Sequence, residues 1–68
     1  MPKMREIRMA CGLSVEQLAA IVGVTKMSIY RYEQGLRIPD VAIAAKIASA
    51  LGCTIEDLIG EKDGKAAG

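Results

Sequence analysis

The chain has 68 residues, enough for one small domain, and no apolar run in it is long enough to span a membrane. Hydrophobic residues make up 51%, but Phe, Trp and histidine (the commonest general base) are absent, so we expect an aliphatic core, no enzymatic activity and no metal or other cofactor. The formal net charge is +1, yet residues 1–39 carry six basic and three acidic side chains, whereas residues 40–68 carry three basic and five acidic ones, a separation that orients a protein toward a polyanion.

The first predicted element is a helix over residues 2–11, with Met4, Ile7 and Cys11 on its inner side. The chain offers no histidine with which Cys11 and Cys53 could form a metal site. We therefore expect two free thiols, buried or half-buried.

Two short helices follow, predicted over residues 15–22 and 26–34 and joined by a turn that Gly23 leads. Ser14 and Thr25 are the hydroxyl residues expected to cap their N-termini. Because the turn is so short, the two helices must cross steeply. This geometry leaves the N-terminal end of the second helix free to enter a DNA major groove.

A fourth helix is predicted to open at Pro39-Asp40 and to end before Gly52, and Thr54 caps a short fifth helix. Strand-like alternation is missing throughout. We therefore expect one all-α domain over residues 1–60, followed by a flexible tail over residues 61–68.

Apolar residues at helical spacing along these segments are expected to form the core. They are Leu13, Leu18, Ala19, Val22, Val24, Ile29, Tyr32, Ala44, Ile47, Ala48, Leu51, Ile55 and Leu58.

A series of residues along the chain has the spacing of a known family: Leu13-Ser14, Leu18-Ala19, Gly23-Val24-Thr25, Ser28-Ile29, Arg31, Glu33, Gly35, Pro39, Leu51-Gly52 and the segment 55–59. In these positions the chain resembles the helix-turn-helix domain of the phage Cro and cI repressors, also called the XRE family. The resemblance covers about residues 4–59. It implies a compact five-helix, lambda-repressor-like fold that binds double-stranded DNA.

The resemblance implies that the helix over residues 26–34 reads bases in the major groove. Its outer residue types suit this role, because Arg31 can bind guanine O6 and N7 in a bidentate manner and Met27 can contact a thymine methyl group. Lys26 can reach guanine or phosphate, and Tyr30 borders the same face. The alternative is that these side chains form a solvated helix surface.

Phosphate contacts are expected around this helix from Thr25, Ser28, the Gly35 amide, Arg37 and the backbone amides of Val15 and Glu16. Many relatives carry Gln where this chain has Val15, and often a basic residue where it has Leu36, so both positions depart from the family pattern. The alternative for Arg37 is an ordinary surface charge.

In several family members, the residues that match Arg8 and Glu33 form a semi-buried ion pair between the first helix and the end of the third. We expect the same pair here, with the structural role of holding the recognition helix in place.

A domain this small reads few base pairs, so we expect a homodimer on a palindromic operator. The candidate residues for contact between two copies are Val41, Ile43, Ile55 and Ile59. A mean hydropathy of +0.26 favours burial in an oligomer. The alternative is that most of these residues line the rim of the core.

Together these features predict a sequence-specific transcription regulator, cytoplasmic and nucleoid-associated when bound to DNA, which represses by occupying an operator. Antitoxins and restriction-modification control proteins share this fold. The alternative from another class is a protein-interaction module, or an antitoxin-type protein that binds a partner, which keeps the fold. Val15, Leu36 and the near-neutral charge favour that alternative.

Overall fold

The computed structural model describes residues 1–60, and the tail predicted over residues 61–68 lies outside them. The described chain forms five α-helices and no strand, which confirms the predicted all-α class: α1 (Met4–Ala10), α2 (Val15–Val22), α3 (Lys26–Gln34), α4 (Val41–Leu51) and α5 (Ile55–Ile59). None of these helices is long and apolar enough to cross a membrane.

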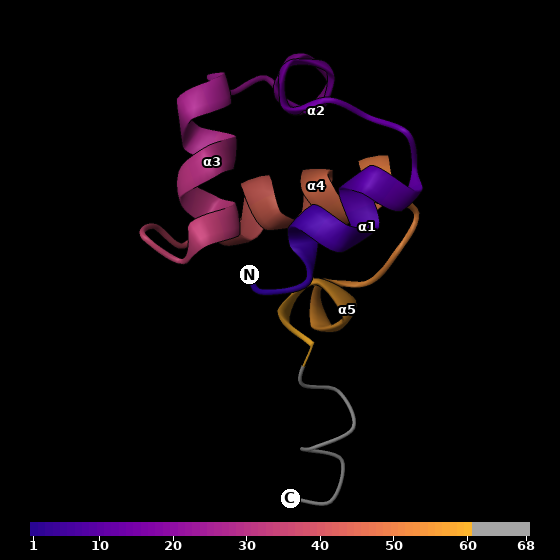
Figure 1. Cartoon of the computed structure of the whole chain (residues 1–68). Helices are drawn as coiled ribbons and strands as arrows, with labels where there is room; N and C mark the ends of the chain where they lie inside the picture. The colour runs from indigo at the N-terminus through magenta and orange to yellow at the C-terminus, as the bar shows by residue number, and fades with distance from the viewer. Residues whose placement is uncertain (61–68) are drawn as a thin grey trace, which may run out of the picture.

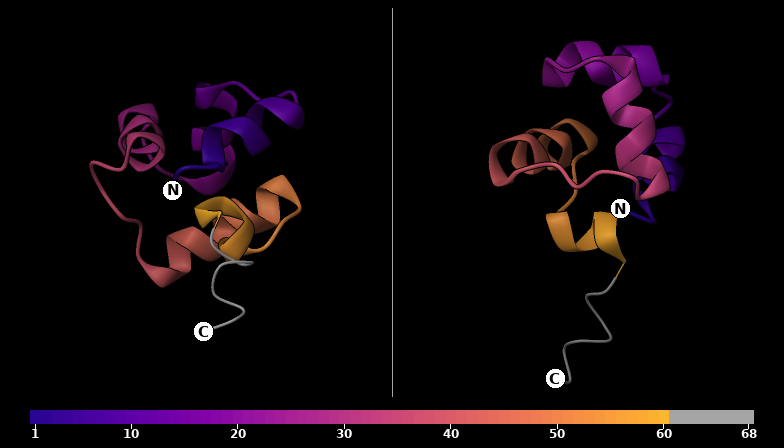
Figure 2. Two further views of the ribbon diagram at one scale, coloured as in Figure 1. Left: turned by 60° about the horizontal axis from the view of Figure 1, so that its bottom comes forward. Right: turned by 90° about the vertical axis from the view of Figure 1, so that its left-hand side faces the viewer.

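The helices pack so that α3 lies at one edge of the molecule. In Figure 1, α2 is seen end-on while α3 runs upright along the left-hand edge, so the two axes cross steeply, as predicted. α2 also packs against α4, and α1 contacts both α3 and α5. The right-hand view of Figure 2 looks onto α3, which no other helix covers from that side.

The core lies between these helices and is aliphatic, as expected. Most residues predicted for it are buried, including Leu18, Ile29 and Ile47, which are fully enclosed. Three predicted core residues, Leu13, Val24 and Ile55, are only partly buried and pack against the core from its rim. Met4 is fully buried, as expected from its place on the inner side of the first helix. Val15, which was not predicted for the core, is also buried.

Side-chain caps and left-handed glycines set the bounds of α2 and α3. Ser14 accepts a hydrogen bond from the Gln17 amide in a capping box at the start of α2, and Thr25 accepts one from the Ser28 amide at the start of α3. α2 ends at Gly23, where the φ angle of 88° lies in a region that residues with a Cβ rarely adopt. The short turn that this geometry permits is what lets α3 cross α2.

The first helix is shorter than predicted. It begins at Met4, because Lys3 provides no side-chain cap and its amide donates to the Leu58 carbonyl at 2.9 Å. The amino terminus donates to the Tyr32 carbonyl at 3.1 Å. Contacts with α5 and α3 thus hold the first three residues. Cys11 ends the helix and is exposed, which corrects the expectation of a buried or half-buried thiol, but its Sγ turns toward α4 and donates to the Leu51 carbonyl at 3.5 Å.

Candidate nucleic-acid interface

The outer face of α3 presents the four residues predicted to read bases. Ile29 and Tyr32 are buried and attach the helix to the core. Lys26, Met27, Tyr30 and Arg31 are all exposed. At the angular step of an α-helix they span about 140° of its circumference. They therefore form one continuous outward surface, which we call the α3 outer face.

Lys26 makes an ion pair with Glu16, which lies in the first turn of α2. Its Nζ lies 3.5 Å from Glu16 Oε2, and more than half of each side chain is exposed. The pKa of the Glu16 carboxyl is lowered, first by a hydrogen bond from the Glu16 backbone amide and then by the Lys26 ammonium. Pairs exposed in this way contribute little to stability, so Lys26 can exchange Glu16 for a stronger acceptor. Arg31 has no ion pair within the described part of the chain.

The loop after α3 places Arg37 in solvent but uses the Gly35 amide elsewhere. Gly35 ends α3 in the left-handed conformation, and its amide donates to the helix carbonyls of Arg31 and Tyr32. The expected contact of the Gly35 amide with a phosphate would therefore compete with the bonds that end the helix. In this loop Arg37 is the exposed cation.

The start of α2 presents one free backbone donor near α3. The Ser14 hydroxyl accepts from the Gln17 amide at 3.0 Å, and the Glu16 amide bonds to its own carboxylate. The Val15 amide finds no acceptor among residues 1–60. The Val15 side chain is buried, so only the backbone at this position can meet a phosphate.

The hydroxyls at the start of α3 are partly committed to capping. Thr25 Oγ1 lies 3.1 Å from Ser28 Oγ and also accepts from the Ser28 amide. Thr25 is exposed and Ser28 is half-buried. Because a hydroxyl can donate while it accepts, Thr25 keeps the capacity to donate to a phosphate oxygen.

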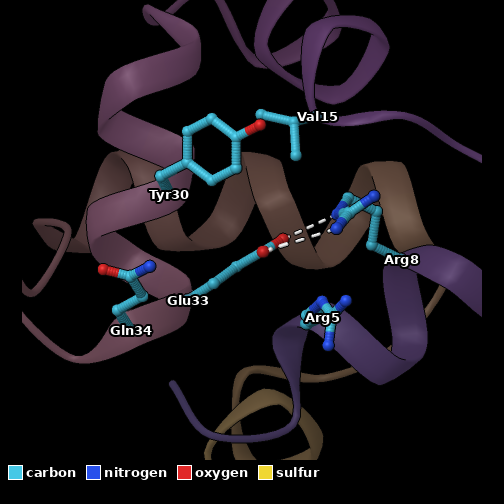
Figure 3. A pocket seen from close by; sticks show the side chains of 6 residues that line it. All are labelled: Arg5, Arg8, Val15, Tyr30, Glu33 and Gln34. Atoms are coloured by element: carbon cyan, nitrogen blue, oxygen red, sulfur yellow. Dashed lines mark hydrogen bonds and ion pairs between the residues drawn. The ribbon is translucent and has the colours of Figure 1, made fainter.

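Arg8 and Glu33 lie in contact between α1 and α3 (Figure 3). Arg8 Nε donates to Glu33 Oε2 at 2.6 Å, and Nη1 donates to the Leu13 carbonyl at 2.8 Å. The two side chains are only 8% and 5% exposed. This pair joins the C-terminal half of α3 to the first helix, where a short, charge-assisted hydrogen bond restricts its orientation.

The candidate dimer residues have different environments. Val41 is 81% exposed at the start of α4. Ile43 and Ile55 are partly buried against the core, and Ile59 is also half-buried. Leu36 and Ile38, which were not predicted for such a contact, are 73% and 85% exposed in the preceding loop. Of these candidates and their neighbours, the most exposed apolar residues therefore lie along residues 36–41 rather than on α5.

A pocket that the sequence did not predict opens between α1 and α3. It has a volume of about 490 Å³ and is lined by Arg5, Arg8, Val15, Tyr30, Glu33 and Gln34. Figure 3 shows these side chains arranged around it, with Tyr30 directed toward Val15. Arg5 and Gln34 carry no sequence signal for this role, because the pocket exists only once α1 packs against α3.

Comparison with known proteins agrees with this geometry. A family model described as helix-turn-helix matches residues 4–58. An uncharacterized HTH-type transcriptional regulator of Methanothermobacter thermautotrophicus is 45% identical over 62 residues, which cover 88% of this chain and 90% of the relative. The uncharacterized HTH-type transcriptional regulator YgzD of Bacillus subtilis is 36% identical over 56 residues, 82% of this chain and 85% of the relative.

Longer relatives also contain this domain. A protein of Methanocaldococcus jannaschii is 42% identical over 48 residues, which are 71% of this chain but 15% of that protein. The chain thus spans a small part of some relatives and most of others. Its folded segment and the family match coincide, and the chain belongs to the XRE-type helix-turn-helix family.

Proposed function

We propose that the protein is a sequence-specific regulator of transcription that inserts α3 into the major groove of double-stranded DNA. The observation that carries this proposal is the α3 outer face, where Lys26, Met27, Tyr30 and Arg31 are exposed together on a helix held from behind by buried residues. Long side chains that donate hydrogen bonds, such as those of Lys and Arg, can reach the edges of bases in the major groove. Relatives of similar length are named as transcriptional regulators.

The phosphate contacts we propose surround that helix. Arg37 in the following loop and Thr25 and Ser28 at the start of α3 supply side chains, and the Val15 amide supplies a backbone donor. Such contacts position a protein on DNA without reading its sequence. They complement the α3 outer face, which carries the specificity.

We propose repression by a homodimer as the mode of action. Two copies related by a two-fold axis would place their α3 helices in successive major grooves, about 34 Å apart, on a palindromic operator. An operator that overlaps a promoter is then closed to the transcription machinery. Val41 and the neighbouring exposed residues Leu36 and Ile38 form the apolar surface that we propose for contact between copies.

Binding to duplex DNA at increasing salt tests the proposed function. Selection of bound duplexes from a random pool first supplies a specific site. Affinity for that site should fall linearly on logarithmic axes as salt rises, with a slope of about −0.9 for each phosphate contact, because bound counterions are released. Failure of the pool to yield any enriched sequence, with no binding to duplex at low salt, would contradict the proposal.

A protein-interaction module is the second candidate, and the exposed apolar segment 36–41 favours it. An apolar protein contact changes little with salt, whereas DNA binding weakens steeply. If the protein binds a partner protein and no DNA, and the affinity for that partner does not change with salt concentration, this second function is supported.

A further inference from the structure

The pocket between α1 and α3 has the lining of an anion site. Arg5 and Arg8 come from α1, Val15 opens α2, and Tyr30, Glu33 and Gln34 come from α3. Figure 3 shows Arg8 and Glu33 joined across the pocket, with Arg5 beside them on α1. The lining therefore combines three ionised side chains with two neutral polar ones.

The charges in this pocket leave one cation without a partner. Arg8 and Glu33 neutralise each other in their ion pair. Arg5 makes no ion pair and no side-chain hydrogen bond within residues 1–60. Arg8 donates three hydrogen bonds, and a guanidinium group carries five N–H donors, so its donors are not exhausted.

The neutral side chains add further donors. The Tyr30 hydroxyl and the Gln34 amide have no hydrogen-bond partner in the described part of the chain, and both residues are exposed. A divalent cation does not suit this lining, because its single carboxylate, Glu33, is already paired. An apolar ligand does not suit it either, because Val15 is the only aliphatic residue among the six.

The position of the pocket selects among anions. An α-helix with its side chains is about 10–12 Å across and fills a major groove about 12 Å wide, so phosphates of the two strands run along its flanks. The pocket lies on such a flank, since Tyr30 belongs both to its lining and to the α3 outer face. A phosphodiester at this place has a guanidinium group and neutral donors within one cavity.

We propose that this pocket binds one phosphodiester of the DNA backbone, with the Arg5 guanidinium as its principal cation and Tyr30 and Gln34 as neutral donors. The proposal rests on the proposed function, which it extends to α1. It gives the first helix a direct contact with DNA, in addition to its support of α3 through Arg8.

Duplexes that carry a single neutral methylphosphonate in place of one phosphate test this directly. The selected site is scanned with such duplexes, using the wild-type chain and the Arg5→Gln variant. Wild-type affinity should fall at several positions. Arg5→Gln should bind the natural duplex about tenfold more weakly, and at one position it should no longer respond to the methylphosphonate.

Lys46→Gln is the matched control, because it removes the same charge from an exposed position on α4 outside the pocket. It should retain the wild-type response at every phosphate. Thermal unfolding followed by circular dichroism should give the same Tm for wild type and Arg5→Gln, since Arg5 holds no other residue in place.

Two outcomes separate this proposal from the proposed function. If Arg5→Gln matches the wild type at every position while the wild type binds its site specifically, the pocket proposal is overturned and DNA binding stands. If the wild type binds no duplex even at low salt, the proposed function fails and the pocket proposal fails with it.

Competition with inorganic phosphate identifies the source of the anion. At matched ionic strength, replacing chloride with phosphate should affect wild type and Arg5→Gln alike, because an isolated anion lacks the binding energy of the rest of the duplex. A loss of DNA affinity confined to the wild type would show that the pocket prefers a free phosphate, which contradicts the assignment to the DNA backbone.

Discussion

At the scale of single residues, Arg31 and Arg37 are both exposed guanidinium groups, yet their positions predict different roles. Replacing Arg31 with Ala should cost about 1–3 kcal/mol of binding free energy and relax the preference at one base pair, because Arg31 lies on the α3 outer face. Arg37→Ala should weaken binding equally on all sequences. Competition with single-base variants of the selected site measures both effects. A uniform loss for Arg31→Ala would show that it contacts only the backbone.

The Arg8–Glu33 pair should be strongly coupled, because both side chains are nearly buried. Arg8→Met or Glu33→Leu alone should destabilise the fold by about 3–5 kcal/mol. Either change leaves the remaining charged side chain buried and without the hydrogen bonds of the pair. The double variant should be more stable than either single one. Urea unfolding measures the cycle.

A surface pair in the same chain is the matched control for that cycle. Lys3 and Glu6 lie 3.5 Å apart, with half or more of each side chain exposed. Substitution of both by Gln should give a coupling energy of less than about 1 kcal/mol. Equal coupling in the two cycles would remove the structural role assigned to Arg8 and Glu33.

The two cysteines should differ in reactivity, because their environments differ. Cys11 is exposed, whereas burial, followed by the charges of Asp57 and Cys11, raises the pKa of the Cys53 thiol. Only the thiolate is nucleophilic, so at pH 8 iodoacetamide should modify Cys11 first. The Cys53 rate should keep rising at higher pH. Mass spectrometry after timed quenching gives both rates, and in concentrated urea the difference should disappear.

Site residues that belong to a recognisable motif were predictable from the sequence. Residues that come together only when helices pack against each other were not. The four exposed positions on α3 follow from helical spacing. Arg5 and Gln34 lie in no motif, and the pocket they line forms between two helices that are distant in sequence. The Gly35 amide, which the family pattern assigns to phosphate, also bonds to the carbonyls that end α3, an engagement that the residue type alone does not indicate.

At the scale of helices, the close approach of α2 to its neighbours depends on Ala19. Ala19 is 5% exposed, whereas its neighbour Ala20 lies in solvent. Ala19→Leu should overpack the interface and cost about 1–3 kcal/mol in the free energy of unfolding. Ala20→Leu in the same helix is the control and should change stability by no more than about 0.5 kcal/mol. Similar values for the two variants would show that α2 has room to shift.

Helix bounds were predictable wherever the signals that set them are local. α2 and α3 begin at hydroxyl caps and end at left-handed glycines, and both were predicted residue for residue. The start of α1 was not, because a hydrogen bond from Lys3 to Leu58 holds the chain there. No pattern within the first ten residues indicates a contact with the fifth helix.

At the scale of the whole molecule, the proposed dimer predicts an effect of Val41. Val41→Glu should abolish cooperative binding to the palindrome, because it introduces charge into an apolar contact. Binding to an isolated half-site should be unchanged, which serves as the internal control. Sedimentation with a labelled duplex counts the bound copies. If two copies still bind the palindrome cooperatively, residues 36–41 are not the dimer surface.

The separation of the α3 outer face from the core has an evolutionary consequence. The exposed side chains of this face, which we propose meet the groove, add little to folding, while the buried Ile29 and Tyr32 anchor the helix. Mutations among the former are therefore nearly silent for thermostability, and a lineage can exchange them one by one without losing its backbone. Under the proposed function, divergent descendants can then address unrelated promoters from one inherited framework, and libraries randomised at these sites offer the same freedom to protein engineers.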